Sequence, residues 1–97
     1  MRTLDDIMAQ LQLLQPDLKR RYPLQRLGVF GSYVRGEQRE GSDLDVLLEL
    51  GNGIGLFEFV GLQQELSDTL GIKVDLADKS TLRRRIGRRI LAEVRML

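Results

Sequence analysis

Apolar residues recur at the spacing of an α-helix in three segments of the chain. The first segment begins at Thr3, a favourable helix cap that is followed by Asp6 three residues later. Its apolar stripe returns at every third or fourth position: Leu4, Ile7, Met8, Leu11 and Leu14. Because proline is tolerated only in the first turn of a helix, Pro16 either interrupts this helix or opens a further turn. Pro23 then ends the helical region.

The other two helical segments lie in the second half of the chain. One covers residues 56–70 and ends at Gly71. The other begins at Ser80, which we expect to cap it, and its apolar residues recur every four positions: Leu82, Ile86, Ile90 and Val94. The remaining surface of this last helix carries five arginines: Arg83, Arg84, Arg85, Arg88 and Arg89. A charged helix face of this kind is usually exposed to solvent. The alternative interpretation is contact with nucleic acid or with an acidic partner.

Three shorter segments have the pattern of β-strands. Residues 24–30 become fully apolar toward their end, residues 44–50 are apolar enough for a buried strand, and residues 72–76 alternate between apolar and polar positions. Strands alternate with helices, which predicts an α/β or α+β fold in which helices cover a small sheet. The glycine-rich residues 51–55 are a loop and not a dinucleotide-binding fingerprint, because Leu56 stands where the third glycine is needed.

Composition limits the architecture and the available chemistry. The 97 residues fit one domain, residues 1–97, and 42% hydrophobic and 30% charged residues are typical of an ordinary globular protein. No apolar run approaches a membrane span and the first six residues are too acidic for a targeting peptide, so we expect a cytoplasmic protein without membrane contact. The absence of Cys and His excludes thiolate nucleophiles, histidine bases and the usual zinc sites.

The net charge of +1 hides an uneven distribution of charge. Residues 37–68 carry one basic and eight acidic side chains, whereas residues 1–36 carry six basic and three acidic ones and residues 69–97 carry eight and three. A fold that brings the acidic middle against basic flanks could bind a polyanion together with its cations.

Carboxylates gather on one face of the predicted sheet. Successive side chains of a strand point to opposite faces, so Asp43 and Asp45 share a face, and Asp75 joins them if its strand is adjacent. Like charges this close repel and raise one another's pKa, so the cluster needs a positive partner. Arginines could supply it, but convergent carboxylates are also the oxygen ligands that Mg²⁺ takes together with phosphates.

A second signal stands at the end of the first predicted strand. Gly31 lets a phosphate approach the backbone, and Ser32 adds a hydroxyl beside the free N–H groups of a short helix. Ten residues separate this pair from Asp43, which gives the pattern G-S-x10-D-x-D. A lone D-x-D is usually structural, whereas the joint presence of both signals is specific.

The stretch "GSYVRGEQREGSDLDVLLEL" resembles the signature of the DNA polymerase beta-like nucleotidyltransferase superfamily, and more closely its minimal nucleotidyltransferase (MNT) family, over residues 24–95. The resemblance implies a small mixed sheet that binds ATP at a site with two Mg²⁺ ions. Gly31 and Ser32 would hold the triphosphate. Asp43 and Asp45 would coordinate both ions, and Asp75 would bind the catalytic ion and help to activate the acceptor hydroxyl. Arg35 and Arg39 are candidates for neutralising phosphate charge, and for Arg39 the alternative is a solvated surface residue.

The same resemblance suggests what accepts the nucleotide. A chain of 97 residues leaves no room for a domain that binds an acceptor, so we expect the acceptor to be a partner protein. Members of the family act as antitoxins beside HEPN-domain ribonuclease toxins, and AMPylation of a toxin tyrosine is associated with them. The leading hypothesis is therefore transfer of AMP from ATP to such a toxin. The alternatives are a non-catalytic antitoxin that neutralises its toxin by stoichiometric binding, and nucleotidyl transfer to a small molecule or an RNA.

Overall fold

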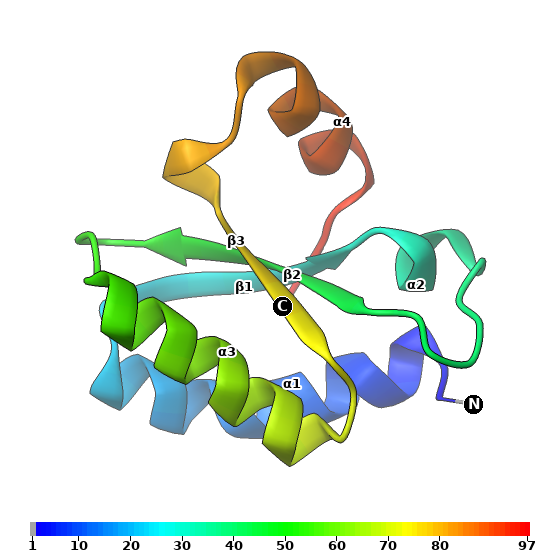
Figure 1. Ribbon diagram of the computed structural model, residues 1–97, viewed down its shortest axis with the longest axis horizontal. Coiled ribbons are helices and arrows are strands. Elements are labelled where there is room, and N and C mark those ends of the chain that lie inside the picture. Colours follow the sequence, from blue (N-terminus) through cyan, green and yellow to red (C-terminus); the bar gives the residue numbers. More distant parts are fainter. Residues whose placement is uncertain (1) are drawn as a thin grey trace.

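The computed structural model describes residues 2–97 and is built around a sheet of four strands (Figure 1). In space the strands follow the order β3 (Val74–Asp78), β2 (Leu44–Leu50), β1 (Leu24–Phe30) and β4 (Arg95–Met96). β1 pairs antiparallel with β2 and with β4, whereas β2 and β3 are parallel. The sheet is therefore mixed, as expected, and the parallel pair requires the helical crossover that α3 (Leu56–Leu70) supplies.

Two long helices cover one face of the sheet and a third helix lies on the other (Figure 1). α1 (Leu4–Arg21) and α3 form the first layer, and α4 (Arg84–Glu93) lies across the opposite face near the ends of β1 and β2. α2 (Ser32–Arg35) is a single turn directly after β1. None of the helices within residues 2–97 is long and apolar enough to cross a membrane.

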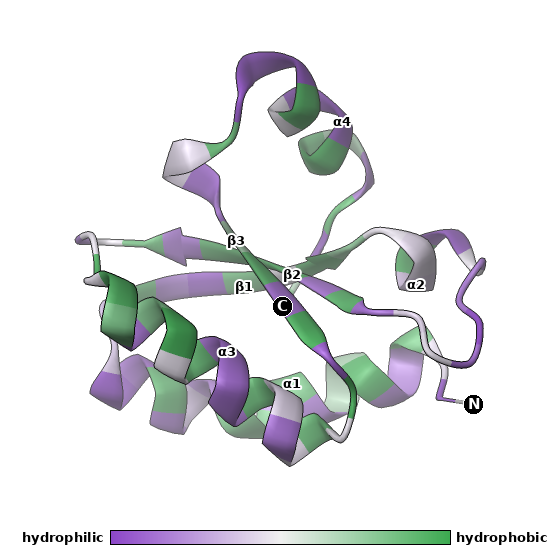
Figure 2. Cartoon of the chain, viewed as in Figure 1, coloured by the Kyte–Doolittle hydropathy of each residue, from purple (hydrophilic) through white to green (hydrophobic). Residues whose placement is uncertain are grey.

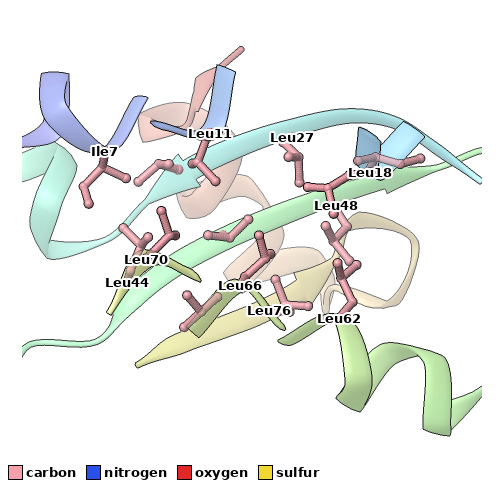
Figure 3. Packing of buried hydrophobic residues seen from close by; sticks show 14 of the residues in the cluster. Ile7, Leu11, Leu18, Leu27, Leu44, Leu48, Leu62, Leu66, Leu70 and Leu76 are labelled. Carbon is pink, nitrogen blue, oxygen red and sulfur yellow. The ribbon is translucent and has the colours of Figure 1, made fainter. Parts of the chain in front are cut away.

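The main core lies between the sheet and the layer of α1 and α3. Figure 2 shows the apolar stripes of both helices turned toward the sheet, and Figure 3 shows their side chains meeting those of β1 and β2. Fully buried members come from each of these elements, namely Ile7, Leu11, Leu27, Val46, Leu48 and Leu62. This dense layer fixes the strands that carry the acidic residues, because packed interiors resist displacement.

Most element boundaries agree with the sequence pattern. The capping box at Thr3 and Asp6 starts α1, Gly71 ends α3 in the left-handed conformation, and β1 and β2 have the expected bounds. Pro16 lies within α1, which continues to Arg21 and neither stops nor restarts there.

Two expectations about the last third of the chain were wrong. The third strand covers Val74–Asp78 and not residues 72–76, because its pairing with β2 continues to Asp78. Ser80 does not cap α4. Asp78 accepts hydrogen bonds from the backbone and the hydroxyl of Ser80 and closes a separate 3-10 turn, η1 (Lys79–Thr81), so that α4 begins only at Arg84.

The short strand β4 was not expected from the sequence. It pairs with β1 where Gly28 leaves room, since a Cβ atom there would lie 2.7 Å from Cγ2 of Val94 and 3.2 Å from the carbonyl oxygen of Arg95. The close approach of the two backbones attaches the end of α4 to the sheet and so places Glu93 beside the end of β1.

Candidate active site

The predicted aspartates lie on β2 and β3. Asp45 is paired with Asp75 in the register of the two parallel strands, and Asp43 precedes Asp45 by two residues, just before β2 begins. Neighbouring strands are about 4.8 Å apart, and paired residues of parallel strands project to the same face. The strand pairing that the hypothesis required is therefore present.

The Gly-Ser pair lies directly against Asp45. Phe30, the last residue of β1, is paired with Asp45, and Gly31 follows it. Gly31 has φ of 82° and ψ of −151°, a region that is essentially restricted to glycine. A Cβ atom at this position would clash with the carboxylate oxygen Oδ2 of Asp45 and would lie 3.0 Å from its Cγ. The Asp45 carboxylate is thus in contact with the backbone of the Gly31–Ser32 turn.

The charges around Asp45 change its pKa. Burial raises the pKa of Asp45, and the negative charges of Asp75 and Asp43 raise it further. The positive charge of Arg35 acts in the opposite direction but does not cancel the rise in the pKa of Asp45, and Lys73 pairs with Asp43, with its Nζ 3.9 Å from Oδ2 of Asp43. Asp45 therefore carries a destabilising negative charge, which a bound cation would relieve.

These carboxylates have the chemistry of a Mg²⁺ site without forming a ready-made cluster. Their oxygen atoms are the ligands that Mg²⁺ prefers, and the repulsion at Asp45 favours a cation. Within residues 2–97, however, no three acidic side chains lie together closely enough to form a metal-binding group. The donor set fits a cation that is held by one or two carboxylates together with the phosphates of a substrate, the usual arrangement for Mg²⁺.

A depression of about 270 Å³ opens beside Asp45 and is bordered by α4. It is lined by Phe30, Gly31, Arg35, Asp45, Ile86, Arg89, Ile90 and Glu93. Four of these residues come from α4, a helix that the sequence pattern did not connect with the site. The sequence carries no local signal for this contact, because the pairing of β4 with β1 helps to bring α4 to the site and joins segments far apart in the chain.

Glu93 links α4 to the Gly-Ser turn. Its Oε1 accepts a hydrogen bond of 3.1 Å from the backbone N–H of Gly31, and its two carboxylate oxygens lie 3.1 and 3.0 Å from Nη1 of Arg35. Arg35 also contacts Glu37, at 3.2 Å, and its hydrogen bond with Glu93 raises its pKa. Arg35 therefore lies at the site, as expected, with its charge already paired.

Arg39, the other arginine considered for phosphate binding, lies elsewhere. Its backbone N–H donates a 2.8 Å hydrogen bond to Oγ of Ser42, and its side chain lines a separate depression of about 300 Å³ together with Arg2, Tyr33 and Lys73. The structure separates Arg39 from the depression at Asp45, and Arg89 takes its place among the lining residues.

In this mixed four-stranded sheet, a Gly-Ser turn contacts the second aspartate of a D-x-D pair, and a third aspartate lies opposite it on the adjacent strand. This arrangement defines a nucleotidyltransferase. Comparison with known proteins agrees. The model of the nucleotidyltransferase domain family matches residues 11–96, and the chain belongs to that family. It is therefore an enzyme of the nucleotidyltransferase class with a nucleotide as substrate.

Individual relatives resemble the chain over nearly its full length. The protein adenylyltransferase MntA of Thermococcus cleftensis is 40% identical over 94 residues, which cover 97% of this chain and 95% of MntA. A solved structure described as a minimal nucleotidyltransferase has a TM-score of 0.82 at 32% identity and covers 99% of this chain and 97% of that chain.

A more distant neighbour has the same fold. It is a chain in the structure of a tri-AMPylated Shewanella oneidensis HEPN toxin in complex with an MNT antitoxin, with a TM-score of 0.63 at 20% identity. The match covers 88% of this chain and 69% of that chain.

Proposed function

We propose that this protein is an antitoxin that transfers AMP from ATP to a hydroxyl group, a tyrosine, of a partner HEPN toxin. The observation that carries the proposal is the contact between the Gly31–Ser32 turn and the Asp45 carboxylate. The contact supports the proposal because glycine lets a phosphate approach the backbone and the adjacent carboxylate favours a cation, and nucleotidyl transfer needs both at one point.

The site residues have the following roles in this proposal. Asp43, Asp45 and Asp75 would hold two Mg²⁺ ions together with the phosphates of the substrate, Gly31 and Ser32 would hold the triphosphate, and Arg35, which is paired with Glu93, would add positive charge. Bound Mg²⁺ supplies neutralisation of phosphate charge and a lower pKa for the attacking hydroxyl. The raised pKa of Asp45 supports the metal assignment, since a cation would relieve the repulsion from Asp75 and Asp43.

The reaction requires no histidine or cysteine. The acceptor oxygen attacks the α-phosphorus of ATP and forms a new P–O bond, while the bond from that phosphorus to the bridging oxygen of the β-phosphate breaks. Pyrophosphate leaves with the electron pair of the broken bond, and the proton of the hydroxyl passes to a carboxylate or to water. The chain has neither His nor Cys, and its carboxylates are sufficient for this proton transfer.

Support for the partner comes from the relatives. MntA of Thermococcus cleftensis is a protein adenylyltransferase, and the Shewanella oneidensis complex joins an AMPylated HEPN toxin with an MNT antitoxin. A HEPN toxin encoded beside this protein is accordingly the acceptor that we propose.

The test is incubation of the protein with α-labelled ATP, Mg²⁺ and the HEPN toxin encoded next to it. We expect label on the toxin, loss of its ribonuclease activity at substoichiometric antitoxin, and no transfer when EDTA is present. Asp45→Asn should abolish the transfer, whereas Asp5→Asn, a change of an exposed carboxylate in the first turn of α1, should not.

Two outcomes would contradict the proposal. Neutralisation only at a one-to-one ratio, without label on the toxin, would indicate a stoichiometric binder. Label on RNA or on a small molecule in place of the toxin would retain the chemistry and refute the acceptor.

A further inference from the structure

The exposed side of α4 forms a basic surface with an unusual lack of negative charge. Arg84, Arg85, Arg88 and Arg89 line a depression of about 650 Å³, and all four are exposed; we call this the α4 arginine surface. Arg84 and Arg88 are four residues apart, as are Arg85 and Arg89, and like charges at this spacing destabilise a helix. The arginines of α4 therefore repel one another and lower the stability of the helix.

The arginines of this surface have no acidic partner in the part of the chain that the structure describes. Within residues 2–97, none of its four arginines takes part in an ion pair. The one acidic residue of α4, Glu93, is engaged with Arg35 and Gly31. On α1 the opposite holds, since Arg20 and Arg21 are paired with Asp17. The charge of the α4 arginine surface is thus available to a ligand.

The surface is continuous with the candidate active site. Arg89 lines both the 650 Å³ depression and the 270 Å³ depression that contains Asp45 and Gly31. Ile86, one turn from Ile90 on the same helix, also borders the active site and is 52% exposed. A ligand that lies along α4 would therefore reach the carboxylates past Arg89.

We propose that the α4 arginine surface binds an acidic segment of the acceptor protein and delivers its hydroxyl to the active site. This inference rests on the proposed function, because it names the surface with which the protein selects its acceptor. Positive charge selects an acidic partner and accelerates its encounter, and the exposed Ile86 and Leu91 offer apolar contact to a protein segment. Nucleic acid is less favoured, because the depressions along α4 hold only one aromatic residue, Phe30, on which a base could stack.

The test uses a random copolymer of glutamate and tyrosine as the probe, since it combines acidic charge with acceptor hydroxyls. The variant is Arg84→Glu/Arg88→Glu, and the matched control is Lys19→Glu/Arg20→Glu, which makes the same charge change on α1, on the other side of the sheet (Figure 1). We expect the α4 variant to bind the copolymer with an affinity at least about tenfold lower than that of the wild type, and the affinity of the control to change by less than about twofold. The reason is that charges within a complementary interface contribute to binding, whereas distant charges contribute little.

Kinetics separate docking from nucleotide binding. With labelled ATP and the copolymer, the α4 variant should show a raised KM for the copolymer and an unchanged KM for ATP. It should also bind a lysine–tyrosine copolymer more tightly than both the wild type and the α1 control do, because a gain from net charge alone would be the same in the two variants. Equal copolymer affinity of wild type and α4 variant would overturn the inference, and so would tighter binding of wild type to a 20-nucleotide single-stranded DNA than to the copolymer.

The result also distinguishes this inference from the proposed function. If the arginines are required for binding the copolymer but no label transfers to any acceptor, the docking surface stands and the adenylyltransferase assignment fails. If label transfers with the same copolymer KM in the variant, the assignment stands and the docking surface is refuted.

Discussion

Replacement of Gly31 by alanine tests the geometry on which the active site rests. The native backbone at this residue has φ of 82° and ψ of −151°, which alanine adopts only at a cost of about 1–3 kcal/mol. The added Cβ would also clash with Oδ2 of Asp45 and lie 3.0 Å from Cγ, so that the carboxylate must move. Displacing a side chain from its rotamer adds about 1 kcal/mol. We expect Gly31→Ala to lose about 2–4 kcal/mol of unfolding free energy, the sum of these costs.

The control for this substitution is Gly36→Ala. Gly36 also has a positive φ, 70°, but no atom lies within 4 Å of the Cβ that the substitution would add. Its cost is therefore that of the left-handed backbone alone, about 1–2 kcal/mol. Urea denaturation of both variants gives the difference, and AMP transfer to the toxin gives the functional effect. Gly31→Ala should lose transfer, while Gly36→Ala should retain most of it.

A double mutant separates the clash from the backbone strain. Gly31→Ala/Asp45→Ala removes the carboxylate that the new Cβ meets, so it should be more stable than the sum of the two single changes predicts, by about 1 kcal/mol. It should remain inactive, because Asp45 is absent. If Gly31→Ala is no less stable than Gly36→Ala, or if the two changes in the double mutant are additive, the contact between the turn and Asp45 is not as described.

Three further predictions follow from burial, charge and hydrogen bonding. The pKa of Asp45 is raised, so its protonated form stabilises the native state at low pH and this contribution is lost as the pH rises above the ordinary value of 3.8. In EDTA, Asp45→Asn should therefore be more stable than the wild type at pH 7 by thermal denaturation, and the difference should shrink toward pH 4; a variant that is less stable at pH 7 would contradict this. Glu93→Ala, which removes the hydrogen bonds to Gly31 and Arg35, should raise the KM for ATP, and Glu93→Gln, which retains the bond to the Gly31 N–H, should recover part of the loss; equal KM values in both variants would refute the positioning role. Leu66→Ala, in the core, should cost about 2–5 kcal/mol in denaturant titration, whereas Leu13→Ala, at a residue that is 83% exposed, should change stability by less than about 0.5 kcal/mol.

Local signals in the sequence were sufficient where neighbouring residues determine the structure. The capping box at Thr3, the left-handed glycine at Gly71 and the bounds of β1 and β2 were predicted correctly, since each depends on a few adjacent residues. The prediction that Ser80 caps α4 failed because the carboxylate of Asp78 binds the backbone and the hydroxyl of Ser80 in η1, and α4 begins only at Arg84. At Pro16 the local preference did not determine the structure, because this residue lies in the interior of α1 although proline by itself tends to disrupt a helix.

For the active site, the sequence by itself determined which residues are candidates. Because side chains alternate between the two faces of a strand, the two-residue spacing of Asp43 and Asp45 puts both on the same face. The pair Gly31–Ser32 marks a turn that a phosphate can approach. Only the tertiary structure decided how these parts meet. It placed Asp75 opposite Asp45 through parallel pairing and brought α4 to the site through β4, so that Glu93 holds Gly31 and Arg89 borders the depression in place of Arg39. The physical reason is that strand pairing and helix docking depend on contacts between distant segments, which no local pattern of residues encodes.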